Sequence, residues 1–153
     1  FLKSYKQEYN LNYTIFRFFN TYGPNQSQDF VIAKFIRLAL QNKDITIYGD
    51  GTQSRTLCYI DDNIEATVNA FLSEDWENTT INIGNDNETS VMDIANKIIE
   101  ITNSSSKIVH LPPLKEGDMT RRLPDITNMK SLLGNRQLVS LEEGIRKILN
   151  KWS

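Results

Sequence analysis

Positions 13–24 read Tyr-Thr-Ile-Phe-Arg-Phe-Phe-Asn-Thr-Tyr-Gly-Pro. The run up to the asparagine is β-branched or aromatic except for Arg17, a composition typical of a strand. The last five residues are those that close a strand with a turn. Apolar side chains then recur with helical spacing over residues 29–42. The stretch therefore predicts a strand, a turn and an amphipathic helix, which is the repeating unit of an α/β protein.

The same alternation of strands and helices continues on both sides of this stretch. Residues 1–9 have a helical pattern, and we expect them to be the tail of a helix. Downstream, capping residues at Asp61 and Ser90 predict the starts of two further helices. Strands are predicted at 45–48, 55–59, 80–83 and 107–111, and short helices at about 125–133 and 140–151.

Composition excludes several classes of protein. The chain has 153 residues, of which 39% are hydrophobic and 24% charged, as in an ordinary globular domain. It has no apolar run of the ~18 residues that a membrane span needs. Its net charge of −2 argues against a nucleic-acid partner bound through bulk positive charge. The single cysteine and single histidine exclude an internal disulfide and a Cys/His zinc site, and they fit a reduced, cytoplasmic setting.

Motifs that usually carry chemistry are missing or incomplete. A dinucleotide-binding loop needs Gly-x-Gly-x-x-Gly between a strand and a helix, but residues 49–54 lack the third glycine and lead to a strand. We interpret them as a tight turn. Asp61 and Asp62 are expected to cap a helix and not to bind a metal. Cys58 and His110 are predicted to be packed side chains, although a Cys–His hydrolase dyad stays open as an alternative.

Two groups of polar residues remain as candidates for ligand binding. Asn20 to Tyr22 end a strand, at the edge where open α/β sheets bind ligands. Arg55 follows a glycine-rich turn, and Arg121 and Arg122 end a polar loop. A guanidinium group suits a diphosphate because its planar fork gives paired, charged hydrogen bonds. The alternative for each arginine is a surface salt bridge.

Taken together, several short segments resemble one enzyme family. They occur in the family's order and span nearly the whole chain. The resemblance is to the NAD-dependent epimerase/dehydratase family of extended short-chain dehydrogenases, which act on nucleotide sugars. Within this family, the sequences of these segments are most similar to those of UDP-glucuronate decarboxylases and sugar 4,6-dehydratases. The segments are FRFFNTYGP at 16–24, FIRLAL at 35–40, ITIYGDGTQSR at 45–55, YIDD at 59–62, INIGN at 81–85, RLPDI at 122–126, LLG at 132–134 and LEEGI at 141–145.

The resemblance implies a particular part of such an enzyme. It predicts the C-terminal, substrate-binding portion of an extended short-chain dehydrogenase, with the last part of the Rossmann sheet at its start. Residues 1–24 would be the tail of the NAD-binding Rossmann domain, and residues 25–153 the nucleotide-sugar-binding domain. Family members also carry a glycine-rich NAD loop and a Tyr-x-x-x-Lys pair whose tyrosine is the acid/base. None of the six tyrosines here has a lysine four residues on. The chain alone is therefore expected to be inactive.

The resemblance also implies ligands and the residues that bind them. The substrate would be a nucleotide-diphosphate sugar. The cofactor of the full-length enzyme would be NAD, which this chain alone is not expected to bind tightly, and the chain would hold no catalytic residue or metal ligand. A homodimer is the expected assembly. Thr21 would border the cofactor. The substrate-binding residues would be Asn20, Phe30, Val31 and Phe35 near the sugar nucleotide, Ile47 and Tyr48 at the base, and Arg55 and Arg122 at the diphosphate.

One departure from the family pattern leaves the reaction open. Asn25 and Phe30 stand where relatives often carry arginine, and the loop between them is shorter. The sequence therefore does not choose between epimerase, dehydratase and decarboxylase. A stand-alone, non-catalytic module that binds a nucleotide sugar or a partner is the alternative. We further predict that the strand at 13–19 is poorly buried and that Arg55 and Arg122 converge on one cleft near Tyr48.

Overall fold

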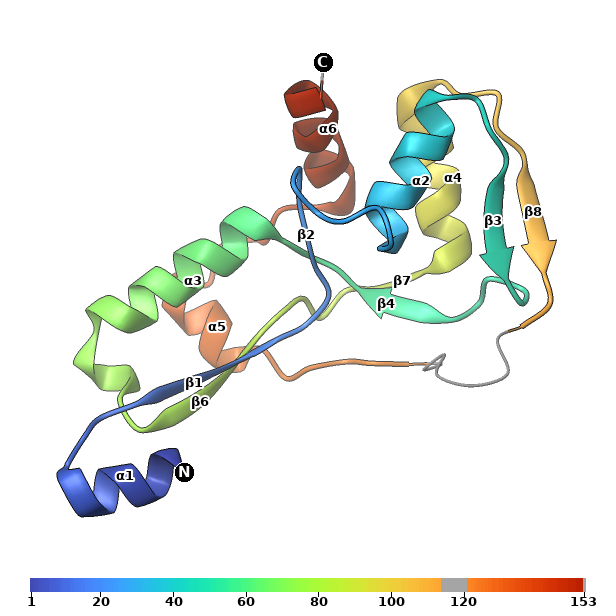
Figure 1. Cartoon of the computed structure of the whole chain (residues 1–153). Coiled ribbons are helices and arrows are strands. Elements are labelled where there is room, and N and C mark those ends of the chain that lie inside the picture. Colours follow the sequence, from blue (N-terminus) through green and yellow to red (C-terminus); the bar gives the residue numbers. More distant parts are fainter. Residues whose placement is uncertain (114–120, 153) are drawn as a thin grey trace.

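The computed structural model describes residues 1–113 and 121–152. Helices and strands alternate along the chain, as the sequence predicts, and Figure 1 shows their arrangement. The helices are α1 (Leu2–Tyr9), α2 (Val31–Leu40), α3 (Ile60–Leu72), the 3-10 turn η1 (Glu74–Trp76), α4 (Val91–Thr102), α5 (Thr127–Leu132) and α6 (Leu141–Trp152). The strands are β1 (Thr14–Phe18), β2 (Thr21–Tyr22), β3 (Ile45–Tyr48), β4 (Ser54–Thr56), β5 (Cys58–Tyr59), β6 (Thr79–Ile83), β7 (Glu88–Ser90) and β8 (Ile108–Leu111).

The strands pair over long distances in sequence, and most pairs are parallel. β1 pairs with β6, β2 with β5 and β3 with β8, all in parallel, whereas β4 and β7 pair antiparallel. Parallel pairing requires crossover connections, which is why helices lie between the paired strands in sequence. The pairing of β1 with β6 shows that the parallel strands beginning at Thr14 continue as far as Ile83.

Two hydrophobic clusters hold these elements together. The larger one joins α2, α4, β3 and α6, with Ile36, Ile94 and Ile145 fully buried. The smaller one lies between α3, α5 and β6 and includes Ile81 and Met129. Figure 1 shows the corresponding division, with α2, α4 and α6 on one side and α3, α5, β1 and β6 on the other. Segment 57–59 contributes to both clusters and so joins the two parts.

Part of the smaller unit presents apolar surface to solvent. The outer side of α3 carries exposed large hydrophobic residues at helical spacing, and Phe71 is 85% exposed. Phe18 at the end of β1 is 56% exposed, and α1 buries none of its residues. These exposed α3 residues are Ile64, Val68, Phe71 and Leu72.

Left-handed turns are formed mainly by asparagine. Two of these asparagines end helices, Asn10 after α1 and Asn103 after α4. Asparagine tolerates this backbone conformation better than other residues with a Cβ. In the described part of the chain, the non-glycine residues with positive φ are Asn10, Asn20, Asn42, Asn78, Asn103 and Asn135, with φ between 31° and 59°.

Within residues 1–113 and 121–152, no helix has both the length and the apolar character needed to cross a membrane. The longest of these, α3, has 13 residues, and its first turn carries two aspartates.

Candidate functional site

A cavity of about 620 Å³ opens where β1 and β2 end. It collects five of the nine site residues that the sequence analysis proposes: Asn20, Thr21, Phe30, Val31 and Arg55. The other lining residues are Phe18, Tyr22, Gln26, Ser27, Asp29, Ile32 and Leu57. Open α/β sheets bind their ligands at such strand ends, so this cavity is the candidate site.

Thr21 is held from two directions at the wall of this cavity. The Gln26 side chain donates from Nε2 to the Thr21 carbonyl oxygen over 2.7 Å. The Asn63 side chain donates from Nδ2 to Thr21 Oγ1 over 2.8 Å, reaching it from α3. Thr21 also pairs with Cys58 in the short β2–β5 ladder. Its backbone and hydroxyl are therefore fixed by three neighbouring segments.

Two buried polar atoms at this cavity lack a partner among the described residues. They are Asn20 Nδ2 and Gln26 Oε1. Because buried polar atoms are nearly always hydrogen-bonded, each such exception calls for an explanation such as a ligand. The Gln26 amide is oriented by its own bond to Thr21, which leaves its oxygen as the free acceptor. Two residues of the wall thus carry one donor and one acceptor that have no partner among the described residues.

The arginines differ in their surroundings. Arg55 lines the cavity, and its Nη1 also donates to the Ser54 carbonyl oxygen over 2.7 Å. Arg121 instead forms a forked ion pair with Glu88, with Nε–Oε1 at 2.9 Å and Nη2–Oε2 at 2.7 Å. The Arg121 hydrogen bonds, together with one from Ser54, lower the pKa of Glu88 to about 2. Of the two roles considered for each arginine, diphosphate binding or a surface salt bridge, Arg121 has the salt bridge.

The remaining proposed residues lie away from this cavity's lining. Phe35 and Ile47 are 3% and 1% exposed in the larger hydrophobic cluster, where they pack as core residues. Tyr48 is 40% exposed, and its carbonyl oxygen accepts from Gln53 Nε2 over 2.9 Å. The backbone carbonyl of Arg122 accepts a long 3.4 Å hydrogen bond from the Thr56 hydroxyl. The predicted ligand-binding roles of these four residues stay predictions.

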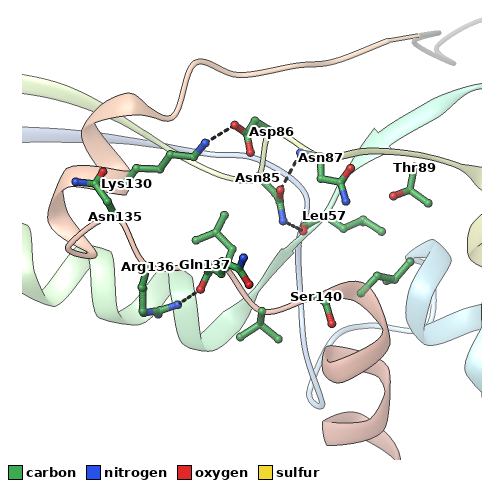
Figure 2. A pocket seen from close by; sticks show the side chains of 13 residues that line it. Leu57, Asn85, Asp86, Asn87, Thr89, Lys130, Asn135, Arg136, Gln137 and Ser140 are labelled. Atoms are coloured by element: carbon green, nitrogen blue, oxygen red, sulfur yellow. Dashed lines mark hydrogen bonds and ion pairs between the residues drawn. The ribbon is translucent and has the colours of Figure 1, made fainter.

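A second cavity of about 400 Å³ lies between the β6–β7 loop and the segment joining α5 to α6. Figure 2 shows its polar wall, where Lys130 forms an ion pair with Asp86 at 2.5 Å and Asn85 Nδ2 donates to the Leu57 carbonyl oxygen at 3.0 Å. Arg136 donates to the Gln137 carbonyl oxygen beside them. None of the proposed site residues lines this cavity.

The residues considered for other chemistries have structural partners. Cys58 is completely buried, and burial raises the pKa of its thiol to about 12, so the nucleophilic thiolate does not form near neutral pH. His110 Nδ1 lies 2.8 Å from the Gly49 carbonyl oxygen. Asp61 pairs with Lys147 at 3.2 Å and Asp62 with Arg136 at 2.8 Å. No group of three or more histidine, cysteine or acidic residues in the described chain is arranged to hold a metal.

Sequence reasoning missed several residues of the candidate site. Gln26, Ser27 and Asp29 lie in the irregular segment between β2 and α2, where no periodicity reports side-chain direction. Asn63 was missed because it is a buried polar residue on a helix, 8% exposed, whose partner is 42 positions away. The expectation that Asp61 and Asp62 cap α3 is wrong, because the helix starts at Ile60 with Tyr59 as its N-cap residue, no side chain caps it, and both aspartates lie inside its first turn.

NAD fits this chain only in part. Thr21 and the unpartnered amide atoms of Asn20 and Gln26 offer polar contacts to one end of such a cofactor. The sequence has no glycine-rich loop to bind its pyrophosphate. The contact of Thr21 with the cofactor therefore stays a prediction.

Comparison with known proteins gives a consistent result. A model of the NAD dependent epimerase/dehydratase family matches residues 1–84. A UDP-N-acetyl-alpha-D-glucosaminuronate decarboxylase of Bacillus cytotoxicus is 40% identical over 144 residues, covering 89% of this chain and 44% of that protein. UDP-glucuronic acid decarboxylase 1 of Danio rerio is 33% identical, covering 98% of this chain and 36% of that protein.

Solved structures give the same picture. UDP-glucose 4-epimerase from Thermotoga maritima, solved with UDP-glucose, has a TM-score of 0.88 at 33% identity. UDP-glucuronic acid 4-epimerase from Bacillus cereus, in complex with UDP-glucuronic acid and NAD, has a TM-score of 0.86 at 30% identity. Each match covers 99% of this chain and 49% of the other. The chain therefore spans about half the length of these relatives, or less.

These matches correct two expectations. The sequence analysis predicted the C-terminal portion of such an enzyme, but the family model matches from residue 1 to residue 84 and the relatives align from the chain start, which points to the N-terminal Rossmann portion. The predicted fold class, a substrate-binding portion with only the end of a Rossmann sheet, is wrong for the same reason. Parallel pairing of β1 with β6 extends the Rossmann-like strands to Ile83. The division at residue 24 stays a prediction.

The family-model match begins with α1 and extends just past β6, so it includes the strand ends around the first cavity. It covers more than half of the chain, and relatives at 33–40% identity extend the similarity over nearly all of it. The chain belongs to the NAD-dependent epimerase/dehydratase family.

Proposed function

We propose that this chain binds the substrate of an NAD-dependent nucleotide-sugar epimerase, dehydratase or decarboxylase. The observation that carries the proposal is the cavity at the ends of β1 and β2, which is lined by Arg55 and by Asn20 and Gln26, each with a buried amide atom that has no partner among the described residues. A nucleoside diphosphate sugar offers an anion for the guanidinium and hydroxyl groups for the amides. Relatives solved with UDP-glucose and with UDP-glucuronic acid support this ligand class.

Each part of the ligand has a proposed neighbour. Arg55 would bind the diphosphate through charged hydrogen bonds, which are stronger than neutral ones. Asn20 and Thr21 would contact the sugar or the nicotinamide, and Phe30 would cover the sugar from the start of α2. Arg122 would add a second cation at the diphosphate, with Tyr48 next to the base.

The chain is proposed to be inactive alone. In the complete enzyme NAD would supply hydride transfer at the sugar, while residues of this chain bind and orient the substrate. The sequence has neither a glycine-rich loop nor a Tyr-x-x-x-Lys pair. We therefore expect no NADH formation and no sugar conversion by the purified chain with NAD and UDP-glucose or UDP-glucuronic acid. Turnover of either sugar would contradict this part of the proposal.

Titration calorimetry with UDP and dTDP tests the binding proposal directly. Replacing Arg55 or Arg122 by alanine should weaken binding about tenfold, the effect of losing one charged hydrogen-bonding group. Lysine should restore only part, because it lacks the planar fork. Arg146→Ala is the matched control, because Arg146 is not one of the proposed site residues and pairs with Glu142 on α6. Equal affinity of all variants, or no binding by the unaltered chain, would overturn the proposal.

A further inference from the structure

The hydroxyl of Thr21 has a hydrogen-bonding direction set by α3. Asn63 is 8% exposed and donates from Nδ2 to Thr21 Oγ1 over 2.8 Å. The backbone of Asn63 is fixed in turn, because its carbonyl accepts from the Thr67 hydroxyl over 2.8 Å and lies within the 13-residue helix. The amide of Asn63 therefore reaches Thr21 from a rigid element.

The chemistry of a hydroxyl group makes this contact informative. A hydroxyl has one proton to donate and lone pairs that accept. The N–H of Asn63 takes a lone pair of Thr21 Oγ1, so the Thr21 proton must point elsewhere. Among the described residues, no hydrogen bond uses Thr21 Oγ1 as a donor. Thr21 lines the first cavity, so a ligand there is the available acceptor.

We propose that Asn63 is a positioning residue that makes the Thr21 hydroxyl a hydrogen-bond donor to an acceptor oxygen of the bound ligand. The inference rests on the proposed function, in which the cavity holds the sugar end of a nucleotide sugar beside the nicotinamide. The acceptor is a sugar oxygen or the carboxamide oxygen of the nicotinamide. Both are neutral oxygens, and binding measurements with the two ligands tell them apart.

Asn63→Asp reverses the direction of this bond with almost no change in shape. A carboxylate can only accept, so it would take the Thr21 proton and leave the ligand without a donor. We expect affinity to fall about tenfold for whichever ligand supplies the acceptor oxygen. The probes are UDP-glucose, NAD and UDP. UDP is the reference because it lacks both the glucose of UDP-glucose and the nicotinamide of NAD.

Variants at Thr21 test the same contact independently of how well Asn63→Asp folds. Thr21→Ser keeps the hydroxyl and should keep the affinity. Thr21→Val removes it and should lose affinity to the same extent as Asn63→Asp. In the Thr21→Val background, Asn63→Asp should add no further loss, because the proton it captures is already gone.

Asn69→Asp is the matched control. Asn69 lies on the same helix and also donates from Nδ2, to the Leu132 carbonyl oxygen over 2.9 Å, but it does not line the cavity. It should lower the melting temperature and leave every dissociation constant unchanged. The inference is overturned if Asn63→Asp and Thr21→Val bind UDP-glucose and NAD as tightly as the unaltered chain. If the unaltered chain does not bind UDP, the proposed function is overturned, and this inference with it.

Discussion

Gly144 on α6 lies directly against Tyr22. A Cβ at this position would fall 2.1 Å from the Tyr22 hydroxyl oxygen. The Tyr22 ring has little room to move, because it is 2% exposed and packs edge-on against Tyr59 with ring centroids 5.4 Å apart. Gly144→Ala should therefore lower the free energy of unfolding by about 1–3 kcal/mol, the usual cost of overpacking.

Urea denaturation followed by circular dichroism measures this loss. Lys151→Ala, an exposed position on the same helix, should change the free energy of unfolding by less than about 0.5 kcal/mol. Equal stability of Gly144→Ala and the unaltered chain would show that Tyr22 is not packed against α6 in solution.

Glu88 should make stability depend on pH in the acid range. Hydrogen bonds from Arg121 and Ser54 lower its pKa to about 2 in the folded chain, whereas an unfolded glutamate titrates near 4.3. A carboxyl with a depressed folded pKa contributes stability above its unfolded pKa, and this contribution is lost as the pH falls toward 2. Glu88→Gln should flatten the acid limb of the stability profile. An unchanged profile in this variant would contradict the assignment.

At the scale of single residues, sequence reasoning proposed strand-end residues that line the first cavity and did not identify the residues that contact them. Asn20 and Thr21 were identified because they follow a strand, and Arg55 because it follows a glycine turn. Gln26 and Asn63 were missed because their importance comes from contacts with Thr21 that only folding creates. Phe35 and Ile47 follow core periodicity, and the structure places both in the core.

Helix α3 is tied to the segment before α6 by the buried carboxylate of Asp62. Its Oδ2 accepts from the Val139 backbone N–H over 2.8 Å, and its Oδ1 lies 2.8 Å from Arg136 Nη1. Asp62 is completely buried, whereas the side chain of Arg136 is 37% exposed. Asp62→Ala should cost about 1–3 kcal/mol, because it leaves the Val139 N–H without its partner, whereas the Arg136 guanidinium keeps its ion pair with Glu65.

Thermal or urea unfolding of Asp62→Ala and Asp61→Ala makes a matched comparison. Asp61 is the neighbouring aspartate, but its ion pair with Lys147 is at the surface, where such pairs contribute about 0–1 kcal/mol. A similar small loss for both variants would show that Asp62 is no more than a helix-start residue.

The order of elements follows the sequence closely, because hydrophobic period and turn residues are local signals. Pairing is different. The predicted strand at 55–59 divides into β4 and β5 around Leu57, and the two parts join different partners, β7 and β2. Nothing local in the sequence reports this change of partner, since it depends on segments 30 or more positions away.

At the scale of the whole molecule, the free edge of β1 and the exposed apolar side of α3 predict self-association. In the described chain β1 pairs with β6 alone, so its other edge is open, and such edges recruit further strands. The apolar side of α3, with Phe71 85% exposed, lies in the same unit. We expect dimers that bury both features, detected as a concentration-dependent mass by sedimentation.

Phe71→Glu together with Val68→Lys should shift this equilibrium to monomers, because charges would have to be buried in the dimer. Lys107→Glu, outside this surface, should leave it unchanged. A chain that is monomeric at high concentration before any substitution, with β1 amides protected from hydrogen exchange, would contradict the prediction.

The asparagines in left-handed turns also affect how this sequence is interpreted. Asn78 and Asn103 each begin an Asn-x-Ser/Thr triplet, the pattern that oligosaccharyltransferase recognises. Both have positive φ, so turn geometry is enough to explain why asparagine is there. The backbone N–H of Asn103 also donates a hydrogen bond to the Glu100 carbonyl oxygen at the end of α4. Turn geometry therefore accounts for these two asparagines without any role as glycan acceptors.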